Sequence, residues 1–345
     1  MKNSSSKCAS EQCKPFKPAI GLRNGHLQTL FPALFRKQTE PEVEIETFEF
    51  NDGDFTECYW HHKPPPESQI PIVTLFHGLQ GSFRSPYIQG MMHALHKVGF
   101  SSVLMHFRGC TGKENRLPRS YHSGDTADAI AWLNHLKTYY PDTPLFAVGY
   151  SLGGNMLLKL LGEQGSDPSS KTLLLKAAVS ISAPMQLEAS AKRMDRGFSK
   201  LYQYHLLKDL KPALLKKYDK HNIKALTGLD QKEVKNLNNF YAFDGAYTAP
   251  IHGFDSAEDY YQKSSSKQFL KKITTPTLII HALDDPFMTD EVLPDKAELS
   301  ISIEIEVYPS GGHVGFVGGS LLKPEYWLEE RVVYYLEEFS ESEIS

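Results

Sequence analysis

The sequence predicts an α/β protein built on a mostly parallel β-sheet with helices on both faces. Short, almost wholly apolar segments recur along the chain, and from residue 71 onward helical segments alternate with them. Fully apolar strands are typical of parallel sheets, because helices bury both faces of such a sheet. The chain has 345 residues, of which 41% are hydrophobic and 23% are charged, so it can bury a large core.

The expected elements follow one another in a regular order. Two β-rich runs at 43–50 and 55–62 flank the sequence NDGD, and an aspartate-glycine pair at such a position favours a hairpin turn. Further strands are expected at 71–77, 101–107, 144–150, 173–182, 276–282 and 302–309. Helices are expected near 86–98, near 124–138, from Leu152 onward and at 324–339.

Two of these helices carry recognisable ends. The helix near 124–138 has Ser123 or Asp125 in position to cap its N-terminus. The last helix is expected to begin at Pro324, because proline is favoured at the first helical position. Its buried stripe is expected to consist of Leu328, Val332, Leu336 and Phe339.

The alternation of strands and helices stops over residues 184–270, where the sequence is helical, lysine-rich and aromatic without a clear strand. An inserted helical cap over the carboxyl ends of the strands explains this interruption. We therefore expect an α/β core formed by residues 18–183 and 271–340. A disordered N-terminal tail at 1–17 and a short C-terminal tail at 341–345 complete the expected organisation.

Charge and cysteine content exclude several classes of protein. The formal net charge of −4 gives no reason to expect a nucleic acid as partner. Between residues 191 and 224, ten Lys or Arg stand against three Asp, which fits either a solvated helix face or an anion-attracting or membrane-touching patch.

No signal peptide and no transmembrane segment is expected. A cytoplasmic, reducing location is expected from cysteines that show neither metal-type pairing nor a disulfide framework: Cys8, Cys13, Cys58 and Cys110.

A nucleophile motif lies where one apolar segment passes into the next. Residues 145–155 read LFAVGYSLGGN, in which Ser151 lies among Gly149, Gly153 and Gly154. The pattern G-x-S-x-G is typical of a sharp strand-to-helix turn that exposes a serine hydroxyl at the top of a sheet. A serine becomes a good nucleophile only when a neighbouring base takes its proton. The rest of the chain should therefore supply a base, an acid and an oxyanion hole.

His313 is the predicted base. It lies in the Gly-rich loop YPSGGHVGFVGG at 308–319, after the last strand, and loops at the carboxyl ends of parallel strands form ligand sites. The acid is expected after the penultimate strand, where Asp284 and Asp285 are adjacent, because a carboxylate there can fix the imidazole tautomer. We favour Asp285, since the acid commonly lies a few residues past the strand end, and Asp284 is the alternative.

The oxyanion hole requires two backbone N–H groups. One is expected from Leu152, which follows the serine at a helix N-terminus, and the other from Leu79 in the loop after the first parallel strand. Gly78 permits the turn in that loop, and His77 is interpreted as structural. Cys110 has no nucleophile motif around it and is interpreted as a small buried hydrophobe.

Several longer motifs extend beyond the serine turn. They are NGHLQTLFPALFR (24–36), FHGLQGSFRSPY (76–87), MHFRGCTG (105–112), YHSGDTADA (121–129), GYSLGGNMLL (149–158), HALDDPFM (281–288) and GGHVGFVGG (311–319). With them the chain resembles the YheT-like branch of the α/β-hydrolase superfamily, also called the AB hydrolase 4 family, from about residue 18 to 340. The resemblance implies the α/β-hydrolase fold, a catalytic triad at Ser151, Asp285 and His313, and no cofactor. It also implies a small-molecule substrate, a carboxylic ester with a short or medium acyl chain.

Two questions stay open at this point. Phe287, Met288 and Phe316 lie close in sequence to the acid and the base, so they either line an acyl pocket or pack in the core. The same triad would also serve an acyltransferase or an amidase. A non-catalytic ligand-binding member of the fold is the alternative outside enzymes, and the intact set of triad candidates argues against it.

Overall fold

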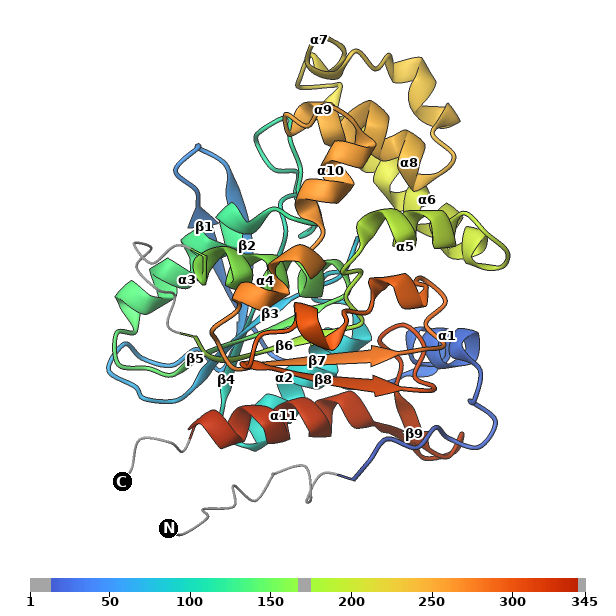
Figure 1. Cartoon of the computed structure of the whole chain (residues 1–345). Coiled ribbons are helices and arrows are strands. Elements are labelled where there is room, and N and C mark those ends of the chain that lie inside the picture. Colours follow the sequence, from blue (N-terminus) through green and yellow to red (C-terminus); the bar gives the residue numbers. More distant parts are fainter. Residues whose placement is uncertain (1–13, 167–174, 341–345) are drawn as a thin grey trace.

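The computed structural model describes residues 14–166 and 175–340, and its central feature is an eight-stranded sheet (Figure 1). Its strands are β1 (Glu44–Glu49), β2 (Phe55–His61), β3 (Ile72–Phe76), β4 (Ser101–Met105), β5 (Leu145–Tyr150), β6 (Leu175–Ile181), β7 (Thr277–Ala282) and β8 (Ile303–Tyr308). They lie in the order β1-β2-β4-β3-β5-β6-β7-β8. All pairs from β4 to β8 are parallel, whereas β2 runs antiparallel to both β1 and β4. The predicted mostly parallel sheet is confirmed.

Helices cover both faces of this sheet. Helices α3 (Thr126–Tyr139) and α4 (Leu152–Gln164) pack on one face, and α2 (Pro86–Lys97) and α11 (Trp327–Ser340) pack on the other (Figure 1). Strand β3 shows how one strand contributes side chains to the hydrophobic clusters on both faces of the sheet. Ile72 and Phe76 join the apolar cluster under α3 and α4, while Val73 and Leu75 join the cluster over α2 and α11. Side chains alternate between the faces of a strand, so a strand that is buried on both faces is largely apolar, with Thr74 as the one polar residue of β3.

Residues 184–270, called the insertion below, lie between β6 and β7. In the structure this segment contains helices and turns and no strand. Its main helices are α5 (Leu187–Met194), α6 (Ser199–Lys217), α7 (Ile223–Thr227), α8 (Phe240–Phe243), α9 (Ala249–Ile251) and α10 (Ala257–Ser264). The insertion has a hydrophobic cluster of its own, to which Leu207, Leu214 and Phe243 belong. In Figure 1 these helices form the upper part of the molecule.

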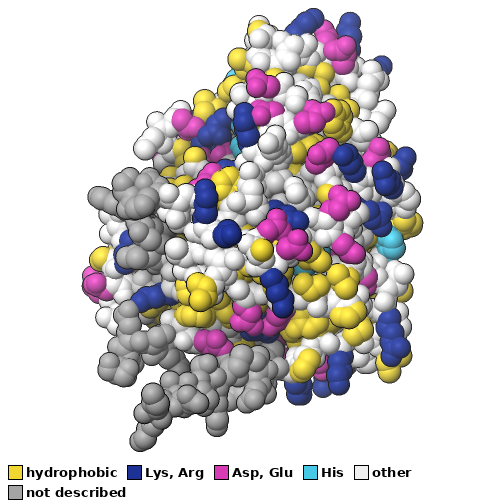
Figure 2. All heavy atoms as spheres, viewed as in Figure 1, with side chains coloured by type: hydrophobic (Ala, Val, Ile, Leu, Met, Phe, Trp, Pro, Cys, Tyr) yellow, Lys and Arg dark blue, Asp and Glu magenta, His cyan; other side chains and the backbone are white. Residues whose placement is uncertain are grey.

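Some lysines of the insertion lie in ion pairs, and others are exposed without one within the described part of the chain. Lys192 pairs with Glu188 at 2.6 Å, and Lys220 pairs with Glu114 at 2.7 Å. Basic and acidic side chains are interspersed over the face of the molecule in Figure 2, including its upper part. Lys217 is an exception, because it is buried. The basic excess between residues 191 and 224 thus combines paired, exposed and buried side chains, and both interpretations of it stay open.

The C-terminal part of the chain differs from the sequence prediction at Pro324. Residues Pro324–Tyr326 form strand β10, which pairs with β9 (Val317–Gly319) in a separate antiparallel sheet. Helix α11 then begins at Trp327 rather than at the proline. Proline lacks a backbone N–H, and a two-stranded edge tolerates that loss. The expected stripe is otherwise present, since Leu328, Val332 and Leu336 are buried and Phe339 packs partly against them.

Two smaller expectations also need correction. Asp125 precedes α3, but its side chain makes no capping hydrogen bond and instead pairs with Arg119 at 3.0 Å. The predicted tail over residues 1–17 lies largely outside the described residues, as does the tail at 341–345. Within the described part, Phe16 is buried and its ring contacts Trp327 at a centroid distance of 5.6 Å.

Among residues 14–166 and 175–340, no helix combines the length and the apolar character needed to cross a lipid bilayer.

Candidate active site

Ser151 lies on the turn between β5 and α4, with φ 51° and ψ −118°. Non-glycine residues rarely adopt a positive φ, so this conformation is strained. The adjacent glycines permit it. A Cβ on Gly149 would lie 2.5 Å from the carbonyl oxygen of Gly153, and a Cβ on Gly153 would lie 2.5 Å from that of Phe76. The backbone therefore closes tightly enough to present the Ser151 side chain outward, as in a nucleophile elbow.

The structure brings Ser151, His313 and Asp285 into one hydrogen-bonded chain. The Nε2 atom of His313 lies 2.9 Å from Ser151 Oγ, and its Nδ1 atom lies 2.8 Å from Asp285 Oδ2. Each residue follows a different parallel strand at the same edge of the sheet: Ser151 follows β5, Asp285 follows β7 and His313 follows β8. A carboxylate on Nδ1 leaves the Nε2 lone pair facing the serine hydroxyl, which is the arrangement that general-base chemistry requires.

The two candidate acids occupy different positions. Asp285 is 4% exposed, and its second oxygen accepts a hydrogen bond from the Phe287 amide at 2.8 Å. Asp284 does not contact the imidazole. Its Oδ1 accepts the Gly312 amide at 2.8 Å and so holds the loop that carries His313. The geometry thus favours Asp285 as the partner of His313 and gives Asp284 a positioning role.

Helix α1 (Gly25–Phe35) contributes contacts that the sequence reasoning missed. The His313 amide donates to Thr29 Oγ1 at 2.8 Å. The Gln28 side chain is wholly buried and bonds both backbone groups of Val317, donating to its carbonyl at 3.0 Å and accepting from its amide at 2.7 Å. A glutamine and a threonine within the apolar run GHLQTLFPALF were the available signal. Through these hydrogen bonds, Gln28 and Thr29 of α1 hold in place the loop that carries His313.

Aromatic rings complete the setting of the imidazole. The Phe287 ring stacks on His313 with a centroid distance of 4.0 Å and an interplanar angle of 9°. Tyr202 from α6 contacts Phe287 at 5.0 Å and accepts or donates a hydrogen bond with His26 at 3.1 Å. Packing of this kind restricts ring rotation, so it preserves the alignment of His313 toward Ser151.

The loop that carries the expected oxyanion donor Leu79 lies next to Ser151, and both residues line the same cavity. A Cβ on Gly78 would be 3.2 Å from Ser151 Cβ, so the loop after β3 passes against the Ser151 side chain. The neighbouring amides of that loop are occupied, since Gly78 donates to Tyr87 Oη and Gln80 donates to Tyr121 Oη, each at 3.0 Å. Within the described residues, the amides of Leu79 and Leu152 have no hydrogen-bond acceptor.

The surroundings of His77 and Cys110 indicate structural rather than catalytic roles. His77 is buried, its Nδ1 donates to the Gly78 carbonyl at 2.7 Å, and its Nε2 accepts the Phe107 amide at 3.1 Å. Burial lowers the pKa of His77 to about 3, which keeps the ring neutral in these two bonds. Burial raises the pKa of the Cys110 thiol to about 12, so it carries no thiolate at neutral pH.

A cavity of about 390 Å³ opens onto Ser151 and His313. Helices of the insertion provide much of its apolar wall, which includes Leu187, Met194, Leu206, Leu210, Leu214, Phe240 and Phe243. Phe287 and Met288 also line it, as the acyl-pocket alternative requires. Phe316 does not. Its ring is completely buried among Phe16, Tyr308 and Trp327, so for this residue the core-packing alternative is correct.

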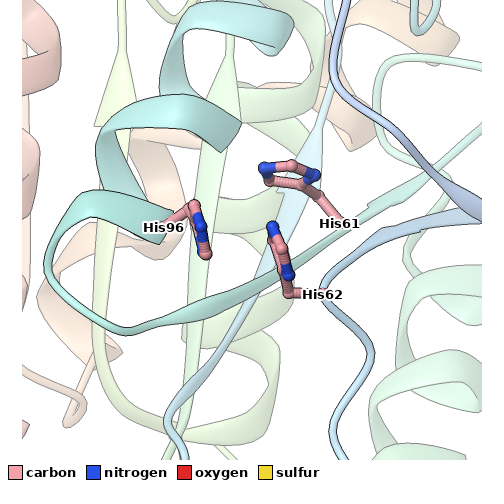
Figure 3. A group of neighbouring side chains, drawn as sticks. All are labelled: His61, His62 and His96. Carbon is pink, nitrogen blue, oxygen red and sulfur yellow. The ribbon is translucent and has the colours of Figure 1, made fainter.

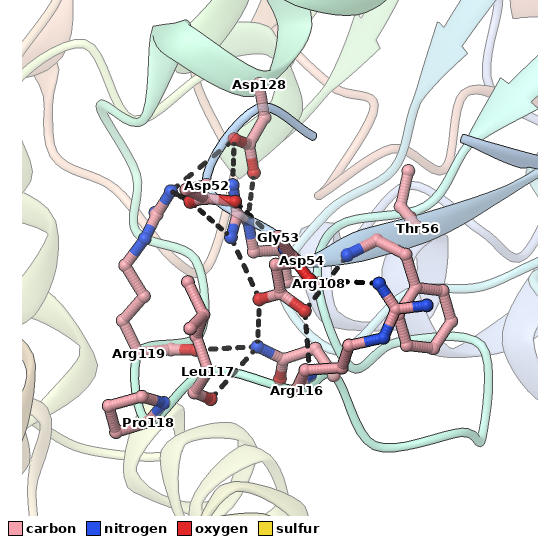
Figure 4. Close-up of polar contacts among 12 residues, drawn as sticks. Asp52, Gly53, Asp54, Thr56, Arg108, Arg116, Leu117, Pro118, Arg119 and Asp128 are labelled. Atoms are coloured by element: carbon pink, nitrogen blue, oxygen red, sulfur yellow. Dashed lines mark hydrogen bonds and ion pairs between the residues drawn. The ribbon is translucent and has the colours of Figure 1, made fainter. Parts of the chain in front are cut away.

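A buried ionic network supports the polar side of the cavity (Figure 4). Arg108 forms ion pairs with Asp54 at 2.9 Å and with Asp128 at 2.6 Å. Asn115 donates to Asp54 at 2.6 Å, and the Lys217 ammonium of α6 donates to Asn115 Oδ1 at 2.8 Å. The hairpin turn, the loop after β4 and the insertion are thereby joined. Burial lowers the pKa of Lys217 to about 8.

Comparison with known proteins agrees with this architecture. The family model described as the alpha/beta hydrolase fold matches residues 71–320. The protein named "Putative esterase YheT" of Escherichia coli (strain K12) is 43% identical over 330 residues, covering 95% of this chain and 94% of its own. Phospholipase ABHD3 of Homo sapiens is 27% identical over 311 residues, covering 89% of this chain and 70% of its own.

Solved structures show the same fold at low sequence identity. The esterase Pf2001 of Pyrococcus furiosus superposes with a TM-score of 0.54 at 15% identity, covering 88% of this chain and 96% of that one. At such identity the likeness concerns the fold alone. The family match and the nearly full-length similarity to YheT show more than the fold. The chain belongs to the α/β-hydrolase family.

Proposed function

We propose that this protein is a serine hydrolase of carboxylic esters, with Ser151 as nucleophile, His313 as general base and acid, and Asp285 as the acid of a catalytic triad. The hydrogen-bonded chain from Ser151 through His313 to Asp285, which opens onto a largely apolar cavity, is the observation that carries the proposal. The names of the relatives support the same class, since they include an esterase, a phospholipase and the monoacylglycerol lipase of Saccharomyces cerevisiae.

Acylation begins when Ser151 Oγ attacks the ester carbonyl carbon. His313 Nε2 takes the hydroxyl proton as the C–O bond forms, and Asp285 stabilises the resulting imidazolium through Nδ1. The tetrahedral intermediate places negative charge on the former carbonyl oxygen. The Leu79 and Leu152 amides would donate to that oxygen, and the N-terminus of α4 adds a favourable dipole.

Collapse of the intermediate expels the alcohol, to which His313 returns the proton. Water then enters, His313 removes its proton, and the hydroxide adds to the acyl-enzyme carbonyl. A second collapse releases the carboxylic acid and restores the Ser151 hydroxyl. Every proton transfer in this cycle uses the one nitrogen that already lies 2.9 Å from the serine oxygen.

We propose further that the insertion acts as a cap that selects the acyl group. Its apolar side chains line a cavity of about 390 Å³, which falls in the range of about 300–1,000 Å³ usual for small-molecule sites. Leu206, Leu210 and Phe240 would surround the acyl chain and exclude water from the reacting carbonyl. Esters of short or medium acyl chains are the substrates that this cavity suits.

Fluorophosphonate labelling tests the nucleophile, and an ester series of increasing acyl length tests the substrate class. Wild type should be labelled and should hydrolyse the esters, whereas Ser151→Ala should do neither, with kcat lower by about a million-fold as for the serine of subtilisin. Ser190→Ala is the matched control, because Ser190 also lines the cavity but bonds only the Gln186 carbonyl. Normal turnover by Ser151→Ala would refute the assignment.

Competing acceptors separate hydrolysis from acyl transfer. Hydrolysis predicts the free carboxylic acid as the main product even when an alcohol or an amine is added. A dominant ester or amide product would assign the same triad to an acyltransferase.

A further inference from the structure

Four histidines gather away from the serine site, where the end of β2 meets the end of α2. They are His61, His62, His93 and His96, and none of them lines the cavity that contains Ser151. Figure 3 shows the rings of His62 and His96 side by side, with the ring of His61 next to them. The proposed esterase mechanism uses none of these residues.

The local backbone explains why adjacent histidines meet. Consecutive side chains of a strand point to opposite faces, so His61 and His62 would normally diverge. The backbone turns at His62, whose φ is 57°, and the two rings lie 4.3 Å apart between centroids. His96 in the last turn of α2 stacks on His62 at 3.6 Å. One ring nitrogen from each of these three residues lies within 4.8 Å of the others.

His61 carries the clearest sign of a missing partner. The residue is 5% exposed, and its Nδ1 lies 2.8 Å from the carbonyl oxygen of Glu42, so Nδ1 carries the proton. Its Nε2 therefore holds a lone pair, and this buried atom has no hydrogen-bond partner. Histidines that bind metals usually donate their other nitrogen to a carbonyl or carboxylate in this way. A buried nitrogen acceptor without a donor is costly unless a ligand occupies it.

We propose that His61, His62 and His96 form a binding site for a divalent transition metal ion, with zinc as the best match. Imidazole nitrogens suit Zn²⁺, Cu²⁺ and Ni²⁺, and three of them with one open position form a common zinc arrangement. Nitrogens at 2.0–2.1 Å from one zinc ion are roughly 3.4 Å apart. His62 and His96 are exposed, so side-chain rotation can bring their nitrogens to that spacing.

The surroundings suit a cation. The C-terminus of α2, where His96 lies, carries the negative end of the helix dipole. His93 lies one helical turn before His96, and its Nε2 is 2.7 Å from the Thr39 carbonyl oxygen. Its Nδ1 is thereby left as a candidate fourth ligand.

A bound ion would tie the end of β2 to the end of α2. These elements are separate in sequence and both contact β4, since β2 pairs with β4 in the sheet and α2 packs on it. Zinc bound by the folded state alone would raise the free energy of unfolding with the logarithm of its concentration over its Kd. The expected role is structural.

Calorimetric titration of Zn²⁺ into the full-length protein, stripped with EDTA and dialysed, tests the site. Wild type should bind one equivalent here and should show a higher Tm with zinc. His62→Ala and His96→Ala should each weaken binding by about tenfold or more and reduce the Tm increase at a fixed zinc concentration. Both side chains are exposed, so both variants should fold. Co²⁺ in place of Zn²⁺ should give visible absorption bands of tetrahedral coordination in wild type only.

Two control variants make the result specific. His205→Ala removes an exposed histidine of α6 and should leave zinc binding unchanged. His252→Ala removes one member of a second group, His122, Asp125 and His252, in which Asp125 is already paired with Arg119. Unchanged zinc affinity in both His62→Ala and His96→Ala would overturn the proposal. So would loss of zinc binding in His252→Ala alone, or no binding by wild type at a Kd of about 10 μM or below.

Discussion

Ser151 holds a backbone conformation that glycine would adopt more readily, yet the proposed chemistry requires a hydroxyl there. The tight approach of Gly149 and Gly153 to neighbouring carbonyls maintains this conformation. Strain of this kind costs about 1–3 kcal/mol and persists only when the surrounding structure enforces it. The β5 strand and the α4 helix provide that enforcement, and the hydroxyl reaches His313 as a result.

The two adjacent aspartates should differ in their effect on turnover. Asp285→Asn should lower kcat by up to about 10⁴-fold, because an amide at this position favours the wrong imidazole tautomer. Asp284→Asn should be milder, since the amide oxygen can still accept the Gly312 amide and the change removes only the negative charge. Steady-state hydrolysis of one model ester measures both variants. The reverse ranking would transfer the role of acid to Asp284.

Asp244 gives a stability prediction that depends on pH. Its carboxylate accepts hydrogen bonds from Thr248 and Tyr261, and burial raises its pKa to about 6. The folded state therefore binds this proton more tightly than the unfolded chain, whose carboxyl has a pKa of about 4. This contribution is fully present below about pH 4 and is lost as the pH rises through about 6.

Asp244→Asn removes that titration. The free energy of unfolding of the variant, relative to wild type, should therefore rise by about 1–3 kcal/mol between pH 4 and pH 7. Denaturant unfolding at the two pH values measures the difference. Asp255→Asn, at an exposed position, is the control and should show no such change. A constant difference for Asp244→Asn would show that folding does not raise the pKa of this carboxyl.

At the scale of elements, α1 supports the loop that carries His313 although it contributes no reacting group. Thr29→Val removes the oxygen that accepts the His313 amide while keeping the shape of the side chain. The loss of that bond should lower kcat about tenfold and destabilise the fold by about 1–3 kcal/mol. Thr138→Val, in which an exposed hydroxyl of α3 is lost, should leave kcat unchanged. Equal turnover by both variants would show that α1 does not position the base.

Substitution of the two adjacent lysines at the end of α6 should affect the free energy of unfolding very differently. Lys217 is 3% exposed and donates to Asn115 Oδ1 at 2.8 Å and to the Leu117 carbonyl at 2.9 Å. Lys217→Met should destabilise the protein by about 1–3 kcal/mol, because these buried acceptors lose their donor. Lys216→Met, at an exposed position, should change stability by less than about 0.5 kcal/mol. Denaturant unfolding compares them, and similar values for both would contradict the buried role of Lys217.

For the whole molecule, the sequence was enough to predict those parts of the fold that a local residue pattern determines. Apolar runs predicted the parallel strands, and the glycines around Ser151 predicted the turn, because both signals lie within a few residues. Apart from the meeting of Ser151, Asp285 and His313, contacts between distant segments escaped prediction. Nothing near Thr29 indicates that it bonds a loop 284 residues away, and nothing near Phe316 indicates that Phe16 and Trp327 enclose it. Lys217 likewise has the sequence context of a surface lysine.

The proposed cap should set the range of acyl chains. Leu210→Trp adds bulk to the apolar wall, so kcat/KM for a medium-chain ester should fall at least about tenfold relative to that for an acetate. Leu201→Trp is the matched control, because Leu201 lies on the same helix but is 57% exposed and does not line the cavity. Ester series for both variants measure the ratio. An unchanged ratio in Leu210→Trp would place the acyl group elsewhere.

The ionic network around Arg108 has a consequence for hydrogen exchange. It joins the hairpin turn at Asp54, the loop at Asn115 and the helix end at Lys217, which are distant in sequence. Separation of any one of these segments would leave buried charges or acceptors without partners, so opening of one requires opening of the others. Their amide protons should therefore exchange with a common protection factor. The hairpin at the far edge of the sheet would then set how often the cavity wall opens to solvent.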